Sequence, residues 1–89
     1  MEYPVIDTKA TGARIRELRK QKNIKVEDLR EFMGFESEQA IYKWQRGDCL
    51  PSIDNLYALS KLFGTTVEDI LREGKQTPSS YSQERDRAC

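Results

Sequence analysis

The chain has 89 residues, of which 37% are hydrophobic and 34% are charged, with 15 basic side chains balanced by 15 acidic ones. A chain this short is expected to form one domain with a small core. Because histidine is absent, serine–histidine and cysteine–histidine catalysis are excluded, and so is the commonest zinc ligand. Since no glycine-rich phosphate loop occurs either, we expect no enzyme, no cofactor and no metal.

The sequence also indicates a cellular compartment. No apolar run reaches the length of a transmembrane helix, and the first residues do not resemble a signal peptide, so we expect a cytoplasmic protein and no membrane contact. Cys49 and Cys89 are too few for the disulfide framework of a small secreted scaffold. We expect both thiols to be free and reduced.

Five short helices separated by turn residues are predicted, and no segment has the apolar alternation of a strand. The first helix covers residues 8 to about 22, with Asp7 or Thr8 as its N-cap and Asn23 as its stop. The second helix covers residues 26 to 33. Its apolar stripe consists of Val26, Leu29, Phe32 and Met33.

The third helix follows a glycine stop at Gly34. It begins after Ser37, whose hydroxyl can accept a backbone N–H bond, and it ends at Gly47. Helical spacing turns two apolar side chains inward and three polar ones outward. The inward residues are Ile41 and Trp44, and the outward ones are Gln39, Lys43 and Arg46.

The fourth helix begins after Pro51 and Ser52, which fix its entry and cap it, and Gly64 ends it. Thr66 caps a fifth helix that runs from residue 67 to about residue 72, and Ile70 and Leu71 dock this helix on the core. The predicted buried side of the fourth helix consists of Ile53, Leu56, Leu59, Leu62 and Phe63.

The composition becomes polar after the fifth helix. Residues 72 to 89 contain too few apolar side chains to offset the cost of ordering, which predicts a disordered tail. We therefore divide the chain into an N-terminal segment with the start of helix one (1–9), a helical domain (10–71) and the tail (72–89).

Four segments carry a resemblance to a known family. They are "IRELRKQKNI" (15–24), "VEDLREFMGF" (26–35), "AIYKWQRGDCLPSIDNLYALSKLFG" (40–64) and "VEDIL" (67–71). Together they resemble the Xre/Cro-type helix-turn-helix family, which includes the lambda repressor DNA-binding domain. The resemblance covers roughly residues 10 to 71 and implies an all-α, five-helix, lambda-repressor-like fold.

The resemblance implies a transcriptional regulator that reads the major groove of DNA with helix three, about residues 38 to 46. Gln39 can pair with adenine and Lys43 with guanine. The residues matching the family's base-reading positions are Ser37, Glu38, Gln39, Tyr42 and Lys43. The basic residues expected to contact the DNA backbone are Arg14, Lys20, Lys25 and Arg46.

Four further residues are expected to have structural roles. Trp44 faces the core, and Gly47 permits a left-handed turn after helix three. Family members commonly carry a glutamate where this chain has Gln45, and that glutamate pairs with an arginine that matches Arg19. We expect Gln45 to accept a hydrogen bond from Arg19 instead.

The expected partner is double-stranded DNA, with a palindromic operator bound by a homodimer that forms either in solution or only on DNA. The alternative is a protein-interaction module of the same fold, such as an antitoxin or an adaptor. Its motives are the zero net charge, the acidic stretch around Glu27 to Glu38, and the tail, which has no assigned role.

Overall fold

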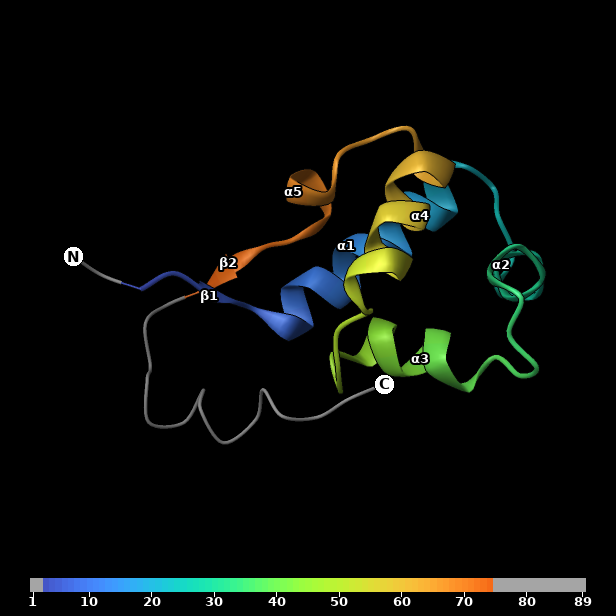
Figure 1. The fold of residues 1–89 in the computed structure, drawn as a ribbon, viewed down its shortest axis with the longest axis horizontal. Coiled ribbons are helices and arrows are strands. Elements are labelled where there is room, and N and C mark those ends of the chain that lie inside the picture. The colour runs from blue at the N-terminus through green and yellow to red at the C-terminus, as the bar shows by residue number, and fades with distance from the viewer. Residues whose placement is uncertain (1–2, 75–89) are drawn as a thin grey trace.

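The helix-forming segments pack into a bundle of short helices in the computed structural model, which describes residues 3–74. The expected all-α class with five helices is confirmed, and α2 lies at the opposite end of the molecule from the strand pair (Figure 1). From residue 75 on, the predicted tail falls outside the described residues. The elements are β1 (Val5–Ile6), α1 (Thr8–Gln21), α2 (Val26–Met33), α3 (Gln39–Arg46), α4 (Ile53–Phe63), α5 (Val67–Ile70) and β2 (Glu73–Gly74).

Local capping signals set several helix ends. The Asp7 carboxylate accepts a hydrogen bond from the backbone N–H of Ala10 at 2.9 Å, which makes Asp7 the N-cap of α1. The Thr66 hydroxyl does the same for the N–H of Asp69 at 3.0 Å, at the start of α5. Asn23 takes the left-handed conformation, with φ 58°, just after α1. Each of these residues acts on backbone groups within a few positions of itself, so the sequence alone predicted these helix ends.

Two predicted helix ends are wrong. The N-cap of α3 is Glu38 rather than Ser37, whose hydroxyl accepts only a long hydrogen bond of 3.4 Å from the N–H of Gln39. This hydroxyl lies one residue too early to reach deeper into the first turn of the helix. α5 ends at Ile70, because Leu71 is already extended and leads the chain into β2.

The strand pair is a feature that the sequence did not predict. β1 and β2 form an antiparallel pair, and the N–H of Arg72 beside them donates to the Thr11 hydroxyl at 3.0 Å. The prediction of no strand is wrong because two residues are too few to show alternation, and their partners lie at the other end of the domain. Ordered structure therefore extends beyond residues 10–71 on both sides. The register pairs Val5 with Gly74 and Ile6 with Glu73.

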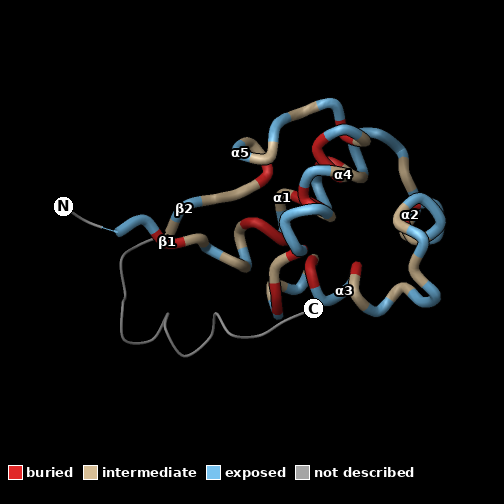
Figure 2. The backbone as a smooth tube through the Cα atoms, viewed as in Figure 1, coloured by how far each residue is buried: buried red, intermediate tan, exposed pale blue. Residues whose placement is uncertain are grey.

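The core lies between α1, α3, α4 and α5 and reaches one side of α2, as the buried segments of Figure 2 show. Trp44 is its largest side chain and is only 1% exposed. The ring of Phe35 meets the Trp44 ring edge-on, with centroids 5.7 Å apart and an interplanar angle of 69°. The other buried members are Ile15, Leu18, Leu29, Ile41, Cys49, Leu56, Leu59, Phe63 and Ile70.

Two residues that the sequence placed on buried stripes lie at the surface. Ile53 is 75% exposed and Phe32 is 50% exposed, so both predictions of burial are wrong. An apolar side chain at helical spacing becomes buried only where another element covers it. Ile53 is the first residue of α4, and helical spacing alone does not show that nothing covers this end of the helix.

Two findings bear on the compartment. Cys49 is 6% exposed and disulfide-bonded, so the expectation of a free thiol is wrong for this residue. The other cysteine, Cys89, lies outside the described residues. Among residues 3–74, every helix is too short or too polar to span a lipid bilayer.

Candidate nucleic-acid interface

The outer face of α3 carries a group of exposed polar side chains. Gln39, Tyr42, Lys43 and Arg46 follow the i, i+3, i+4, i+7 spacing of one helical face and line an open hollow on the surface. On the opposite face of α3, Ile41 and Trp44 are buried. The sequence predicted that Gln39, Lys43 and Arg46 face outward, and the structure places Tyr42 beside them. None of the four side chains has a role in the core.

α3 is held against α1 by contacts between backbones. A Cβ atom on Gly12 would lie 2.1 Å from the carbonyl oxygen of Trp44, which is shorter than any tolerable contact. A Cβ atom on Gly47 would lie 2.7 Å from the Cα of Lys9, and Gly47 has a φ of 83°. Sequence reasoning missed Gly12, although a glycine inside a predicted helix is a known sign of close packing.

A polar contact links the same two helices. The Nε of Arg19 donates a hydrogen bond of 3.0 Å to the Oε1 of Gln45, which is the bond that we expected from the sequence. The Nη1 of Arg19 also donates to the carbonyl of Ile24 at 2.9 Å. Arg19 therefore joins α1, the connection to α2 and α3 in one network, and it helps to fix the orientation of α3.

The turn between α2 and α3 has its own brace. The Nη1 of Arg30 on α2 donates to the carbonyl oxygen of Phe35 at 3.0 Å, a contact that sequence reasoning missed. Within this turn Ser37 is exposed and Glu38 is partly buried, and both precede the first turn of α3. The expected base-reading residues thus occupy the start and the outer face of one short helix.

The cations near α3 differ in their surroundings. The side chain of Lys43 forms no hydrogen bond or ion pair with any residue in 3–74, although its backbone carbonyl accepts from the N–H of Asp48. Arg46 donates from Nε at 3.0 Å and from Nη2 at 2.8 Å to the same carboxylate oxygen of Asp48. Lys25 is the N-cap residue of α2, but its exposed ammonium cannot cap the helix because it has no acceptor. The Lys25 backbone N–H donates to the Asp28 carboxylate at 3.4 Å.

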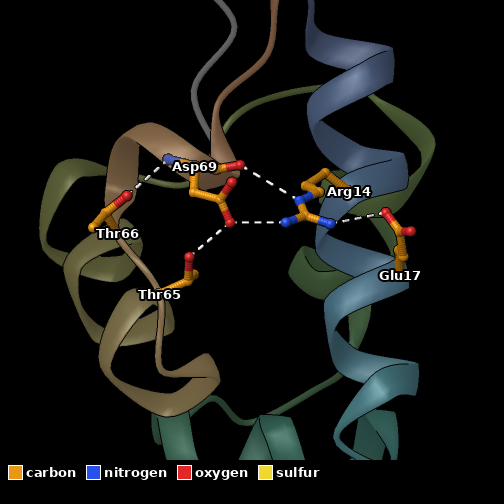
Figure 3. A network of polar contacts seen from close by, with 5 residues as sticks. All are labelled: Arg14, Glu17, Thr65, Thr66 and Asp69. Atoms are coloured by element: carbon orange, nitrogen blue, oxygen red, sulfur yellow. Dashed lines mark hydrogen bonds and ion pairs between the residues drawn. The ribbon is translucent and has the colours of Figure 1, made fainter.

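Arg14 is held within the protein, away from the group of side chains on α3. Its guanidinium lies between α1 and α5, where it donates to the carboxylate of Asp69 at 2.8 Å and to that of Glu17 at 3.1 Å (Figure 3). The side chain is only 18% exposed. We conclude that Arg14 joins α5 to α1. Lys20 remains exposed on the last turn of α1, without a partner among the described residues.

This network perturbs the ionisation of its members. The hydroxyl of Thr65 and then the guanidinium of Arg14 lower the pKa of Asp69, because both stabilise its charged form. The two carboxylates, led by Asp69, raise the pKa of Arg14. Elsewhere, the hydroxyl of Ser52 lowers the pKa of Asp54 at the start of α4. Within residues 3–74, acidic and thiol side chains do not gather into a group that could hold a metal ion.

Comparison with known proteins places this geometry in a family. The model of the helix-turn-helix family matches residues 15–70, which is most of the described chain. The chain belongs to the Xre/Cro-type helix-turn-helix family. The match covers α2, α3, α4 and α5 together with the C-terminal half of α1.

Several individual helix-turn-helix proteins are similar to this chain. The HTH-type transcriptional activator BcrR of Enterococcus faecalis is 34% identical over 58 residues, which are 65% of this chain but only 28% of BcrR. The P22 c2 repressor, solved with a synthetic operator, is 35% identical with a TM-score of 0.65, and the match covers 73% of this chain and 97% of the repressor. The restriction-modification controller protein C.AhdI of Aeromonas hydrophila is 25% identical with a TM-score of 0.64, over 72% of this chain and 96% of C.AhdI.

Proposed function

We propose that this helix-turn-helix chain is a sequence-specific DNA-binding regulator of transcription that reads the major groove with α3. The observation that carries the proposal is the outer face of α3, where four polar side chains without a role in the core stand on a helix that α1 holds in place. The names of the relatives agree, because BcrR is a transcriptional activator and the P22 c2 repressor was solved with a synthetic operator.

Base recognition is assigned to the start and the outer face of α3. The side-chain amide of Gln39 can form a bidentate pair with adenine, in which its oxygen accepts from N6 and its NH2 group donates to N7. Lys43 can donate to N7 and O6 of guanine. Tyr42 can contact a thymine methyl group. Ser37 and Glu38 stand where the N-terminal end of a recognition helix meets base edges. A single half-site would therefore span only a few base pairs.

Backbone contacts are assigned to the cations that surround this helix. Lys25 stands at the N-terminus of α2, where free N–H groups and the helix dipole favour a phosphate. Arg46 stands at the other end of the α3 face, and Lys20 is an exposed cation on α1. We leave out Arg14, because its guanidinium is already taken by Asp69 and Glu17. Such contacts set the register and the salt dependence of binding.

The proposed partner is a palindromic operator in the nucleoid of the cytoplasm, bound by two copies of the chain. Two-fold symmetric binding places the two recognition helices about 34 Å apart, one turn of the double helix. We propose that the homodimer forms on DNA, where each copy contributes one α3 to a half-site.

Selection of binding sites from random duplex DNA tests the proposal. The full chain is incubated with the pool at low salt, and bound duplexes are amplified and sequenced over several rounds. We expect an inverted repeat whose half-sites are one helical turn apart. If folded protein enriches no motif at all, the proposal is refuted. Enrichment of a single unrepeated site would refute only the two-copy arrangement.

A second candidate function rests on α4. Ile53 is 75% exposed and Tyr57 is 60% exposed, one turn apart on the same helix, and Lys61 lies 5.1 Å from the centre of the Tyr57 ring. Neighbouring exposed apolar side chains favour a protein contact, as in an antitoxin or an adaptor. A partner that copurifies after nuclease treatment, and that is lost when Ile53 is replaced by serine, would support this function.

A further inference from the structure

The cation at the end of the α3 face, Arg46, is paired with an acidic side chain, Asp48. Asp48 follows α3 by two residues, and a single oxygen of its carboxylate accepts from both Nε and Nη2 of Arg46, at 3.0 and 2.8 Å. These two donors form one edge of the guanidinium. Both side chains remain open to solvent, with exposed fractions of 60% for Arg46 and 52% for Asp48.

The backbone of the turn holds Asp48 in this position. Its N–H donates to the carbonyl of Lys43 at 3.0 Å, and the N–H of Gly47 donates to the carbonyl of Trp44 at 3.1 Å. These bonds close the C-terminal turn of α3 around the left-handed Gly47. The short Asp48 side chain has little freedom to move away, whereas the long Arg46 side chain can turn toward another anion.

We propose that Asp48 is an internal competitor of the DNA backbone for Arg46, and that it sets how strongly the chain binds DNA of any sequence. The inference rests on the proposed function and deepens it. A phosphate that binds the Nε–Nη2 edge of the guanidinium needs the two donors that the carboxylate now holds. On this edge phosphate has to displace Asp48 from Arg46, and on any edge the nearby Asp48 charge repels it.

The exposure of the pair keeps this competition reversible. Exposed ion pairs are weak, changing an equilibrium by up to about fivefold, so DNA can take Arg46 from Asp48. A buried pair would withhold the arginine altogether. Lys43, on the same face, has no such competitor among the described residues, so the effect is confined to the backbone contact and does not extend to base reading.

The test replaces Asp48 by asparagine, which keeps the shape of the side chain and removes its charge. Affinity is measured by fluorescence anisotropy, with a selected duplex and with a scrambled one, over a series of salt concentrations. We expect D48N to bind both duplexes about three- to fivefold more tightly at low salt. We also expect the plot of log affinity against log salt to steepen by up to about 0.9, the value for one added phosphate contact.

Two further variants separate this competition from a general charge effect. Glu68→Gln removes one negative charge from the exposed side of α5 and should change affinity much less than D48N does. The double variant R46A/D48N should bind no more tightly than R46A, because Asp48 acts through Arg46. Thermal melting of each variant checks that the fold is kept.

The outcomes distinguish the inference from the function on which it rests. If the wild type binds DNA and D48N binds no more tightly, or if D48N tightens binding equally well without Arg46, the inference fails and the function stands. If neither protein binds any duplex, both fail. Independently of DNA, the Arg46 Nε–H resonance of the free protein should shift in D48N, and an unchanged resonance would show that the pair does not form in solution.

Discussion

The contact between α1 and α3 makes a sharp prediction for Gly12. Substitution by alanine adds one methyl group in a helix, which ordinarily stabilises a helix by up to about 1 kcal/mol. Here the added Cβ atom would lie 2.1 Å from the carbonyl oxygen of Trp44 and 2.8 Å from that of Gln45. We predict that Gly12→Ala destabilises the protein, against the intrinsic helix preference.

The size of the effect follows from these distances. A carbon and a carbonyl oxygen in contact normally lie about 3.3 Å apart, so α1 and α3 must separate by about 1 Å. The opposing atoms belong to the backbone of α3 and cannot rotate away as a side chain could. Overpacking of this kind costs about 1–3 kcal/mol, and we expect the upper end. Subtracting the helix preference leaves a net loss of about 2 kcal/mol.

Urea denaturation followed by tryptophan fluorescence measures this loss. Trp44 is the single tryptophan of the chain, and it is 1% exposed in the folded state, so its emission reports unfolding at the contact itself. With a slope of about 1 kcal/mol per molar urea for a domain of this size, the midpoint should fall by about 2 M. The melting temperature should fall by roughly 10 °C.

A neighbouring residue supplies the control. Ala13 lies on the exposed side of α1, and Ala13→Gly should cost up to about 1 kcal/mol through helix preference alone. If Gly12→Ala instead raised the urea midpoint, the helix preference would have outweighed the clash. The close approach of α1 to α3 would then be refuted, and with it the account of how α3 is held.

The remaining predictions concern DNA reading, the Arg19 bond and acid stability. Lys43→Ala should reduce discrimination between bases at one base pair by about 1–3 kcal/mol. Lys25→Ala should weaken binding to all sequences and reduce the slope of log affinity against log salt by about 1. If both variants lost affinity equally on all sequences, the base-reading role of Lys43 would be refuted. Gln45→Glu should leave the urea midpoint unchanged or higher, because a carboxylate makes a charge-assisted bond to Arg19; a lower midpoint would contradict the 3.0 Å contact. Because the pKa of Asp69 is lowered from 3.8 on folding, its carboxylate stabilises the protein above that pH, and this contribution is lost as the pH falls through the lowered value. Asp69→Asn should therefore flatten the fall in stability below about pH 4 in urea melts, and an unchanged acid limb would argue against the network.

The position of each helix was determined largely by the sequence alone. Asp7, Asn23, Gly34 and Thr66 act on backbone groups only a few residues away, so their effect can be read locally. The same holds for the division of α3 into an inner and an outer face, because helical periodicity is itself a local property.

The tertiary structure alone decided which neighbours each residue meets. The sequence shows that Arg14 and Arg46 are charged, but not that one is clamped by Asp69 across the chain while the other shares its donors with Asp48. The sequence likewise does not show that α3 approaches Gly12 closely, or that no element covers Ile53. Burial and pairing depend on residues far apart in the sequence, and a local pattern carries no information about them.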